Sequence, residues 1–408
     1  MADLTAAERA ERLARLLVGF GANVQPGQIA LVGGDIDDRE LMRAVATECY
    51  RAGARDVEVS YIDPYLKRSR ILYGGDGSIG YAPSWEFDRA RAARAERCAS
   101  INLTGGTDPK VLAGLDPDRL GRDRSPAGRE WLKAITERSI NWTIGPSPSP
   151  AWAAVVHPDM PADAALEQLW LDIERVCRLD EPDPVASWEQ RGGVLVAVAD
   201  RMTERGFDAL HFQGPGTDLT VGLLPSSRFV SGGISTAEGI AHWPNLPSEE
   251  VFTTPDPDRV DGQVRSTKPL DVGGTVVTGL RVRFEGGRAV AIEADAGAEM
   301  LRARTMIDEG GSRLGEVALV DGDSRIGRLD TVFYETLLDE NAACHIALGS
   351  GLDYAVGDER DFDRINRSEI HIDFMIGSNE VDVTAITQDG ERVPVLRGGA
   401  WDTGLTSA

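Results

Sequence analysis

A histidine and an aspartate stand two residues apart near the C-terminal end of the chain, in the segment 369–377. Apolar and polar residues alternate along this segment, which is the period of a strand with one buried face. Glu369, His371 and Asp373 therefore share one face of the predicted strand. An imidazole and a carboxylate at this spacing suit a divalent metal ion. The motif alone is weak evidence, because a strand with a merely polar outer face has the same pattern.

Three more acids stand in apolar surroundings. Glu249 and Glu250 fall within the proline-containing stretch 245–255, and Glu316 lies inside the apolar run 314–320. Burying a carboxylate is costly unless a cation or hydrogen-bond donors compensate for it. A salt bridge can explain each acid separately, whereas convergence on divalent cations would explain all of them together.

The chain has five histidines, and most have an ordinary structural explanation. His157, His211 and His242 are predicted to be surface or packing residues. His345 opens a short apolar run after a predicted helix. An isolated histidine in such a place is more often buried and hydrogen-bonded than a metal ligand, so its context must decide.

Strands and helices alternate in the first part of the chain. Apolar runs predict buried strands at residues 29–32, 57–61, 101–103 and 140–144. Amphipathic periodicity predicts helices at residues 5–20, 38–52 and 127–138. This alternation is typical of a mainly parallel α/β sheet. Glycines at 75, 77 and 80 match the dinucleotide-binding spacing but join no strand to a helix, so they predict a loop.

The second half of the chain has a different texture. Two further helices are predicted at residues 161–178 and 184–203. Beyond Gly206, short alternating runs between Gly, Pro and Asp predict strands at 209–212, 219–223, 276–284 and 289–294, with helices at 296–308 and 331–338. We predict an α/β protein in which an N-terminal parallel-sheet domain, residues 1–210, precedes a β-rich α+β domain, residues 211–408, that carries the candidate ligands.

Composition limits the classes of partner. The 408 residues are 42% hydrophobic and 6% aromatic, which fits a folded globular protein of two or three domains. The net charge of -23 argues against nucleic acid and anionic membranes as partners. No signal peptide and no run of ~20 apolar residues is recognisable. The four cysteines form no CxxC, so we expect reduced thiols and a cytoplasmic location.

Five segments, in order along the chain, resemble motifs of the thermophilic-type metallo-aminopeptidases, the aminopeptidase T and S family. They are residues 214–222, 245–255, 314–320, 339–349 and 368–378. Segments 16–27 and 50–63 match as well, so the resemblance covers nearly the whole chain. It implies a homodimeric exopeptidase that hydrolyses N-terminal residues from short peptides.

The resemblance also implies a set of metal ligands. Carried over motif by motif, they are Glu250, Glu316, His345, His371 and Asp373. Two divalent ions per chain (Zn, Co, Mn or Mg) would share a bridging water, and Glu316 or, second, Glu250 would accept its proton. Glu249 is a weaker substitute for Glu250, and Glu340 is a supporting carboxylate. The family pattern does not require an acid at Glu369.

One position departs from the family pattern. The family has a tyrosine seven residues after the first metal-binding histidine, where its hydroxyl can stabilise an oxyanion. This chain has Leu352 there and Tyr354 two residues later. Two residues are one strand period, so Tyr354 can point the same way if the loop is shifted. Otherwise the role is vacant, which would affect the rate and substrate range more than the metal site.

Two alternatives remain open from the sequence. The family also resembles 2,5-dihydroxypyridine dioxygenases, in which one Fe(II) would need only His345, His371 and Asp373. The missing tyrosine favours that interpretation, whereas Glu250 and Glu316 speak against it. The other alternative is a non-catalytic relative, which predicts no tightly bound metal. The number of metal ions per chain distinguishes these hypotheses.

Overall fold

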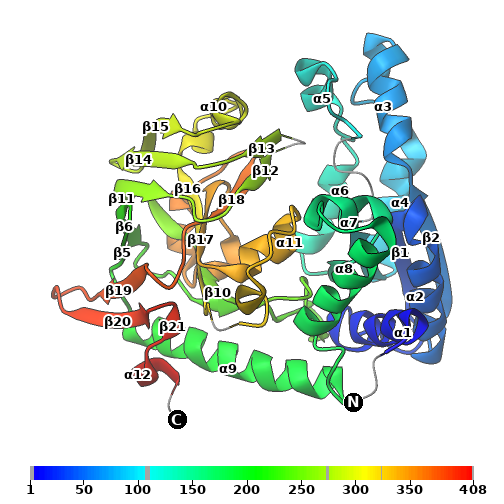
Figure 1. Ribbon diagram of the computed structural model, residues 1–408, viewed down its shortest axis with the longest axis horizontal. Helices are drawn as coiled ribbons and strands as arrows, with labels where there is room; N and C mark the ends of the chain where they lie inside the picture. Colours follow the sequence, from blue (N-terminus) through cyan, green and yellow to red (C-terminus); the bar gives the residue numbers. More distant parts are fainter. Residues whose placement is uncertain (1–3, 106–110, 273–274, 323, 407–408) are drawn as a thin grey trace. The chain divides into compact units, whose positions relative to one another are not determined.

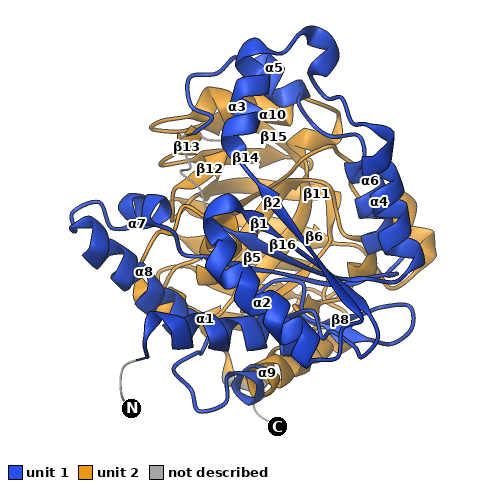
Figure 2. Cartoon of the chain, turned by 90° about the vertical axis from the view of Figure 1, so that its right-hand side faces the viewer, with its two compact units in different colours: residues 1–188, 233–247 blue, residues 189–232, 248–408 orange. Residues whose placement is uncertain are grey.

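The computed structural model describes residues 4–105, 111–272, 275–322 and 324–406. The chain forms two compact units, shown in different colours in Figure 2. Unit 1 comprises Met1–Trp188 and Gly233–Pro247, and unit 2 comprises Glu189–Gly232 and Ser248–Ala408. The domain boundary predicted near residue 210 is a separate statement about folding domains, and the division into compact units does not test it.

Unit 1 contains the predicted parallel sheet. Its strand order is β2-β1-β3-β4, and every neighbouring pair is parallel (Figure 1). The strands are β1 (Ile29–Asp35), β2 (Asp56–Ile62), β3 (Ala99–Thr104) and β4 (Asn141–Pro146). The main helices of this unit are α1 (Ala6–Arg15), α2 (Arg39–Arg51), α3 (Pro64–Tyr73), α4 (Ser84–Ala95), α6 (Gly128–Thr136), α7 (Pro150–Val156) and α8 (Ala162–Val176). The prediction of an α/β fold is therefore confirmed.

The glycines at 75, 77 and 80 join two helices. A short 3-10 turn, Asp76–Ser78, lies between α3 and α4. No strand leads into this turn. The segment is a loop, as predicted, and lacks the strand-to-helix turn of a dinucleotide-binding site.

Unit 2 is built on two antiparallel sheets. The larger sheet has the order β15-β14-β11-β6-β5-β19-β20-β21. Its strands are β5 (Ala209–Gly214), β6 (Thr217–Leu223), β11 (Pro255–Arg265), β14 (Arg281–Glu285), β15 (Arg288–Glu293), β19 (Asp382–Ile386), β20 (Arg392–Arg397) and β21 (Ala400–Trp401). The smaller sheet has the order β18-β17-β16-β10-β7. Its strands are β7 (Val230–Ser231), β10 (Glu250–Thr253), β16 (Leu314–Val320), β17 (His345–Gly349) and β18 (His371–Met375). All four neighbouring pairs of the smaller sheet are antiparallel.

The smaller sheet has one apolar face. Alternate residues on it, among them Val317, Ile346 and Phe374, are fully buried. They belong to the same hydrophobic cluster as Phe212 and Val221 of the larger sheet. Because successive residues of a strand point to opposite faces, the residues between them are directed away from this core.

Two predicted elements have different bounds in the structure. The run 276–284 is not one strand: β13 (Thr275–Val277) and β14 (Arg281–Glu285) are separated at Gly279, whose φ of +59° interrupts an extended backbone. The helix predicted at 331–338 is a single short turn, α11 (Thr336–Asp339). Within the described ranges, no helix is long and apolar enough to cross a membrane.

Candidate metal centre

The smaller sheet of unit 2 brings all five predicted ligands onto one face. Glu250 starts β10, Glu316 lies in β16, His345 starts β17, and His371 and Asp373 belong to β18. Directly opposite residues of an antiparallel ladder share a face of the sheet. The strand register therefore places these five side chains together, on the face opposite the core.

Small residues separate the polar side chains on this face. Ala347 stands between Glu316 and Asp373 in the register, and Ala318 stands opposite His345. An alanine leaves the space above the sheet open, where a larger side chain would fill it. We call this part of the sheet face, where alanine methyl groups lie between the candidate ligands, the polar hollow.

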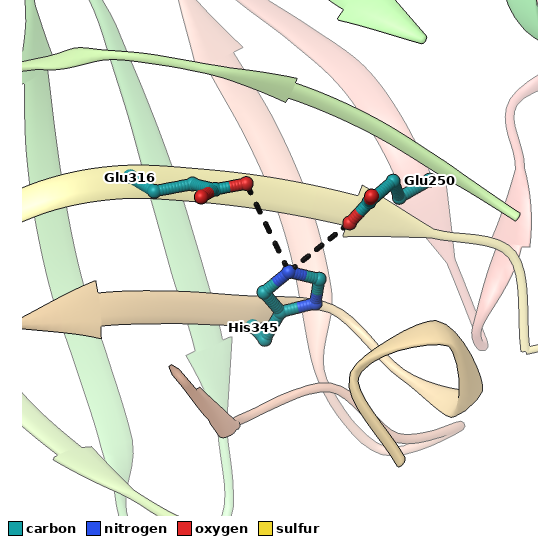
Figure 3. A group of neighbouring side chains, drawn as sticks. All are labelled: Glu250, Glu316 and His345. Atoms are coloured by element: carbon teal, nitrogen blue, oxygen red, sulfur yellow. Dashed lines mark ion pairs between the residues drawn. The ribbon is translucent and has the colours of Figure 1, made fainter. Parts of the chain in front are cut away.

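His345 lies against two carboxylates (Figure 3). Its Nε2 is 3.2 Å from Oε2 of Glu250 and 4.0 Å from Oε1 of Glu316. In Figure 3 both carboxylates are directed at this nitrogen from neighbouring strands. All three residues are buried.

A second group forms around His371. Its Nε2 is 3.0 Å from Oε2 of Glu316 and 3.4 Å from Oδ1 of Asp373. Within each of the two groups, the candidate ligand atoms all lie within 4.8 Å of one another. Glu316 belongs to both groups and offers a different oxygen to each imidazole.

Backbone carbonyls fix the orientation of both imidazoles. His345 Nδ1 lies 3.2 Å from the carbonyl oxygen of Ala343, and His371 Nδ1 lies 2.8 Å from that of Ser350. A carbonyl oxygen only accepts, so Nδ1 carries the proton in both rings. This leaves each Nε2 to face the carboxylates, the arrangement typical of metal-binding histidines.

The electrostatics of the cluster favour cations. Burial lowers the pKa of His345, but the hydrogen bond to Glu250 and the neighbouring negative charges outweigh it and raise this pKa to about 10. Burial also lowers the pKa of His371, yet the charge of Asp373 holds it well above its ordinary value. Burial raises the pKa of Glu316. The carboxylates of the cluster thus favour a positive charge beside them, which a divalent cation would also supply.

Glu249 lies elsewhere, although it is adjacent to Glu250 in the sequence. Its carboxylate accepts a 2.5 Å hydrogen bond from Nε of Arg191, a residue of α9 (Pro184–Arg205), and it is completely buried. The two neighbouring acids therefore have different partners. Glu249 is neutralised by a guanidinium, so the strand presents only Glu250 to the imidazoles.

Glu340 is a further buried carboxyl near the cluster. It begins the short 3-10 turn Glu340–Ala342, just before β17. Burial raises its pKa well above the ordinary value, and the charges of Asp373 and Glu250 raise it further. It therefore lies within electrostatic reach of the cluster, yet it belongs to neither group of candidate ligands.

The loop that departs from the family pattern lies beside the same hollow. The backbone N–H of Leu352 donates to Thr254 Oγ1 at 2.9 Å. The Tyr354 ring packs edge-on against Phe252, with a centroid distance of 6.1 Å. Tyr354 is 50% exposed. Desolvation of its phenol, followed by the negative charges of Glu316 and Glu250, nevertheless raises the pKa of that group. Its hydroxyl is therefore in electrostatic reach of the candidate ligands.

The sequence interpretation missed Asn341. This fully buried side chain accepts a 2.6 Å hydrogen bond from the backbone N–H of Glu249 and donates a 2.9 Å bond to the Leu337 carbonyl. It thereby ties the residue before Glu250 to the turn that contains Glu340. The only sign of this role in the sequence was the position of Asn341, an amide beside a mostly apolar segment.

Asp308 was also missed, and it explains the position of Glu369. Its carboxylate accepts hydrogen bonds from the backbone N–H of Glu369 at 2.6 Å and from Ser368 Oγ at 2.8 Å. These bonds hold the chain outside the sheet until His371, where β18 begins. Glu369 therefore lies outside the strand that the alternating pattern predicted, and it is not among the candidate ligands.

The donors present fit divalent metal ions. Two imidazole nitrogens and three carboxylates converge, and Oδ1 of Asp373 is buried without a hydrogen-bond partner in the described part of the chain. Carboxylates and imidazoles together accept Zn, Co, Mn or Mg. An unsatisfied buried carboxylate oxygen beside two imidazoles is the arrangement expected of a metal ligand.

Comparison with known proteins supports the same chemistry. The sequence model described as thermophilic metalloprotease (M29) matches residues 6–401. Aminopeptidase T of Thermus aquaticus is 43% identical over 404 residues, which cover 97% of this chain and 98% of that protein. Aminopeptidase PepS of Streptococcus thermophilus is 35% identical over 405 residues, with 97% and 98% coverage.

The fold comparison agrees with the sequence comparison. The solved structure of wild-type AmpT from Thermus thermophilus is 40% identical and has a TM-score of 0.91. The match covers 97% of this chain and 100% of that chain. The family resemblance predicted from the motifs is therefore confirmed. The chain belongs to the M29 family of metallopeptidases, which are hydrolases that act on peptide bonds.

Proposed function

We propose that this protein is a dinuclear metallo-aminopeptidase that releases N-terminal residues from short peptides. The observation that carries the proposal is the sharing of Glu316 between two donor groups, one with Glu250 and His345 and the other with His371 and Asp373. Family membership supports the reaction type. A single-iron dioxygenase site would need only two histidines and one carboxylate, and would leave two buried glutamates unexplained.

Two divalent cations held by these groups would share a bridging water, lower its pKa and polarise the scissile carbonyl. Zn, Co, Mn and Mg all accept this donor set. The protein itself holds the metal-ligating side chains in place and fixes their orientation. The strands fix the carboxylates, and the carbonyls of Ala343 and Ser350 fix the imidazoles. The free α-amine of a peptide would bind a metal ion or a nearby carboxylate, which distinguishes its N-terminus from internal residues.

Proton transfer needs a carboxylate with a free oxygen. The sequence pointed to Glu316 and then Glu250, but both belong to the proposed ligand groups. Glu340 belongs to neither group but interacts electrostatically with members of both, so we propose that it accepts the proton and passes it to the leaving amine. Its raised pKa suits a carboxyl that must hold a proton between the two steps.

Tyr354 is our proposed oxyanion donor. Its phenol lies near the carboxylates, and its ring is braced by Phe252. A hydroxyl there would donate to the carbonyl oxygen as negative charge develops during attack. The tyrosine would thus compensate for Leu352.

The homodimer and the cytoplasmic location inferred from the resemblance and the composition stay predictions. Sedimentation of the purified 44.0 kDa chain tests the first of them. A mass equal to one chain at micromolar concentration would contradict the homodimer.

Metal removal tests the proposed function. Chelator-treated protein should release no leucine from a dipeptide, and added Zn, Co, Mn or Mg should restore the activity. When metal is added stepwise to the chelator-treated protein, the activity should stop rising at two ions per chain. His371→Ala should lose most of the activity and the second ion. His211→Ala is the matched control, because His211 pairs with Asp218 on the larger sheet.

Three results would contradict the proposal. The first is full activity without metal, the second is saturation at one ion per chain, and the third is a metal-loaded wild-type protein that cleaves no dipeptide. Ring cleavage of a dihydroxypyridine with one iron per chain would instead support the dioxygenase.

Glu340→Gln separates proton transfer from metal binding. We expect kcat to fall by roughly 10²–10⁴ because the proton acceptor is lost. Metal affinity, measured by competition with a chromophoric chelator, should stay within a few-fold of wild type. Glu369→Gln is the control on an exposed acid. If Glu340→Gln keeps its kcat, proton transfer belongs to Glu316 or Glu250, as the sequence suggested.

Tyr354→Phe removes only the phenolic hydroxyl. We expect kcat to fall by roughly 10²–10³, the effect of losing one oxyanion donor. Both metal ions should remain bound. Tyr81→Phe on the surface of unit 1 controls for the substitution itself. An unchanged kcat in Tyr354→Phe would mean that the role of the family tyrosine is vacant here.

A further inference from the structure

A cavity of about 500 Å³ lies within unit 2, and neither the proposed ligands nor Tyr354 line it. Much of its wall is glycine backbone, including Gly322, Gly377 and Gly399. Glycines leave backbone amides and carbonyls accessible to a ligand. The volume is in the range of small-molecule binding sites.

Two charged side chains line the cavity, Lys268 and Asp330. Asp330 is exposed, whereas Lys268 is half-buried. Lys268 is one of four lysines in the chain and the only one beyond residue 133. Within the described ranges its ammonium makes no direct ion pair, but its charge reaches the buried Asp339, where it opposes the rise in pKa that burial causes in that carboxyl. A half-buried ammonium with no carboxylate in direct contact leaves its N–H donors to an anion that enters the cavity.

The cavity adjoins the Glu250–His345 end of the candidate metal centre. Ala343 lines the cavity, and its carbonyl oxygen lies 3.2 Å from Nδ1 of His345. Val320 also lines it and is paired directly opposite Glu250.

The residue beside Lys268 is tied to the strand that faces His345. The backbone N–H of Thr267 donates a 2.8 Å hydrogen bond to Met375, which is paired directly opposite His345. Lys268 therefore lies on a segment anchored to the edge of the metal centre.

We propose that this cavity binds the C-terminal part of a short peptide, and that the Lys268 ammonium pairs with the peptide's terminal carboxylate. The inference rests on the proposed aminopeptidase function and adds a preference, which is for short peptides with a free terminal carboxylate. The two ends of such a peptide carry opposite charges. The α-amine would lie at the metal centre, and the Lys268 ammonium would pair with the carboxylate.

Lys268→Met tests the pairing, with Leu-Leu and its C-terminal amide as the two substrates. Wild type should have a lower KM for the free acid than for the amide. The substitution should raise KM for the acid by roughly 10- to 100-fold, the effect of losing one charged hydrogen bond. KM for the amide, kcat for both substrates and the metal content should stay within about two-fold, a split that a merely structural defect would not produce.

Two controls accompany this variant. Lys133→Met changes a surface lysine of α6 and should leave both KM values unchanged. Lys268→Arg keeps the positive charge and should recover part of the preference for the acid. The carboxylate bound by Lys268 could instead belong to the released amino acid, and inhibition by free leucine tests this. If Lys268→Met weakens leucine inhibition but leaves KM for Leu-Leu unchanged, the cavity binds released product and the proposal is wrong.

Equal changes of KM for acid and amide, or no change for either, would overturn the role of Lys268. Failure of the metal-loaded wild type to cleave both substrates would overturn the proposed function instead. Isothermal titration of Leu-Leu into chelator-treated wild type and Lys268→Met gives a readout that does not need turnover. The wild type should bind at least ten-fold more tightly, and equal affinity would contradict the pairing.

Discussion

The accumulation of buried negative charge on one face of a sheet is the constraint on which this site depends. Glu250, Glu316, Asp373 and Glu340 share a region from which water is largely excluded. Burial raises the pKa of Glu316 and Glu340, and neighbouring carboxylates raise both further, which makes their burial costly. The two imidazoles can compensate only part of the negative charge of four carboxylates. The fold therefore holds a destabilising arrangement that a divalent cation relieves, which couples metal binding to stability.

Hydrophobic packing on the other face of the same sheet offsets the free-energy cost of burying these carboxylates. Val317, Ile346 and Phe374 alternate with the polar residues and join the core shared with the larger sheet. A strand that is apolar on one side and polar on the other is fixed in register, since a shift by one residue would bury the charges in the core. The geometry of the ligands is thus set by packing behind them. Asn341 and Asp308 then fix the segments that lead into the strands.

Much of the site could be predicted from local patterns. The alternation around His371 and Asp373 indicated a shared face, and Glu316 was conspicuous as an acid inside an apolar strand. The sharing of Glu316 by two groups could not be predicted, because it depends on the register between strands far apart in the chain. The opposite orientations of Glu249 and Glu250 became clear only with Arg191 in place. Glu369 shows the limit of periodicity, since a hydrogen bond from outside the strand decides where the strand begins.

The fold, like the site, could be predicted from the sequence only in part. The alternation of strands and helices in the first half was sufficient to predict a parallel sheet. In the second half, short strands were recognisable, but the order of the smaller sheet joins segments that lie between Val230 and Met375. Such long-range pairing is stabilised by the common core and leaves no local signal. Gly279, which divides one predicted strand into two, acts through a backbone angle that the apolar pattern does not show.

Anomalous diffraction can show whether Glu316 binds two metal ions, as we propose. Crystals of the manganese- or zinc-loaded protein would be measured on both sides of the metal absorption edge. We expect two anomalous peaks per chain, one beside Glu250 and His345 and one beside His371 and Asp373, with the Glu316 carboxylate between them. A single peak per chain, or two peaks of which only one contacts Glu316, would contradict this proposal.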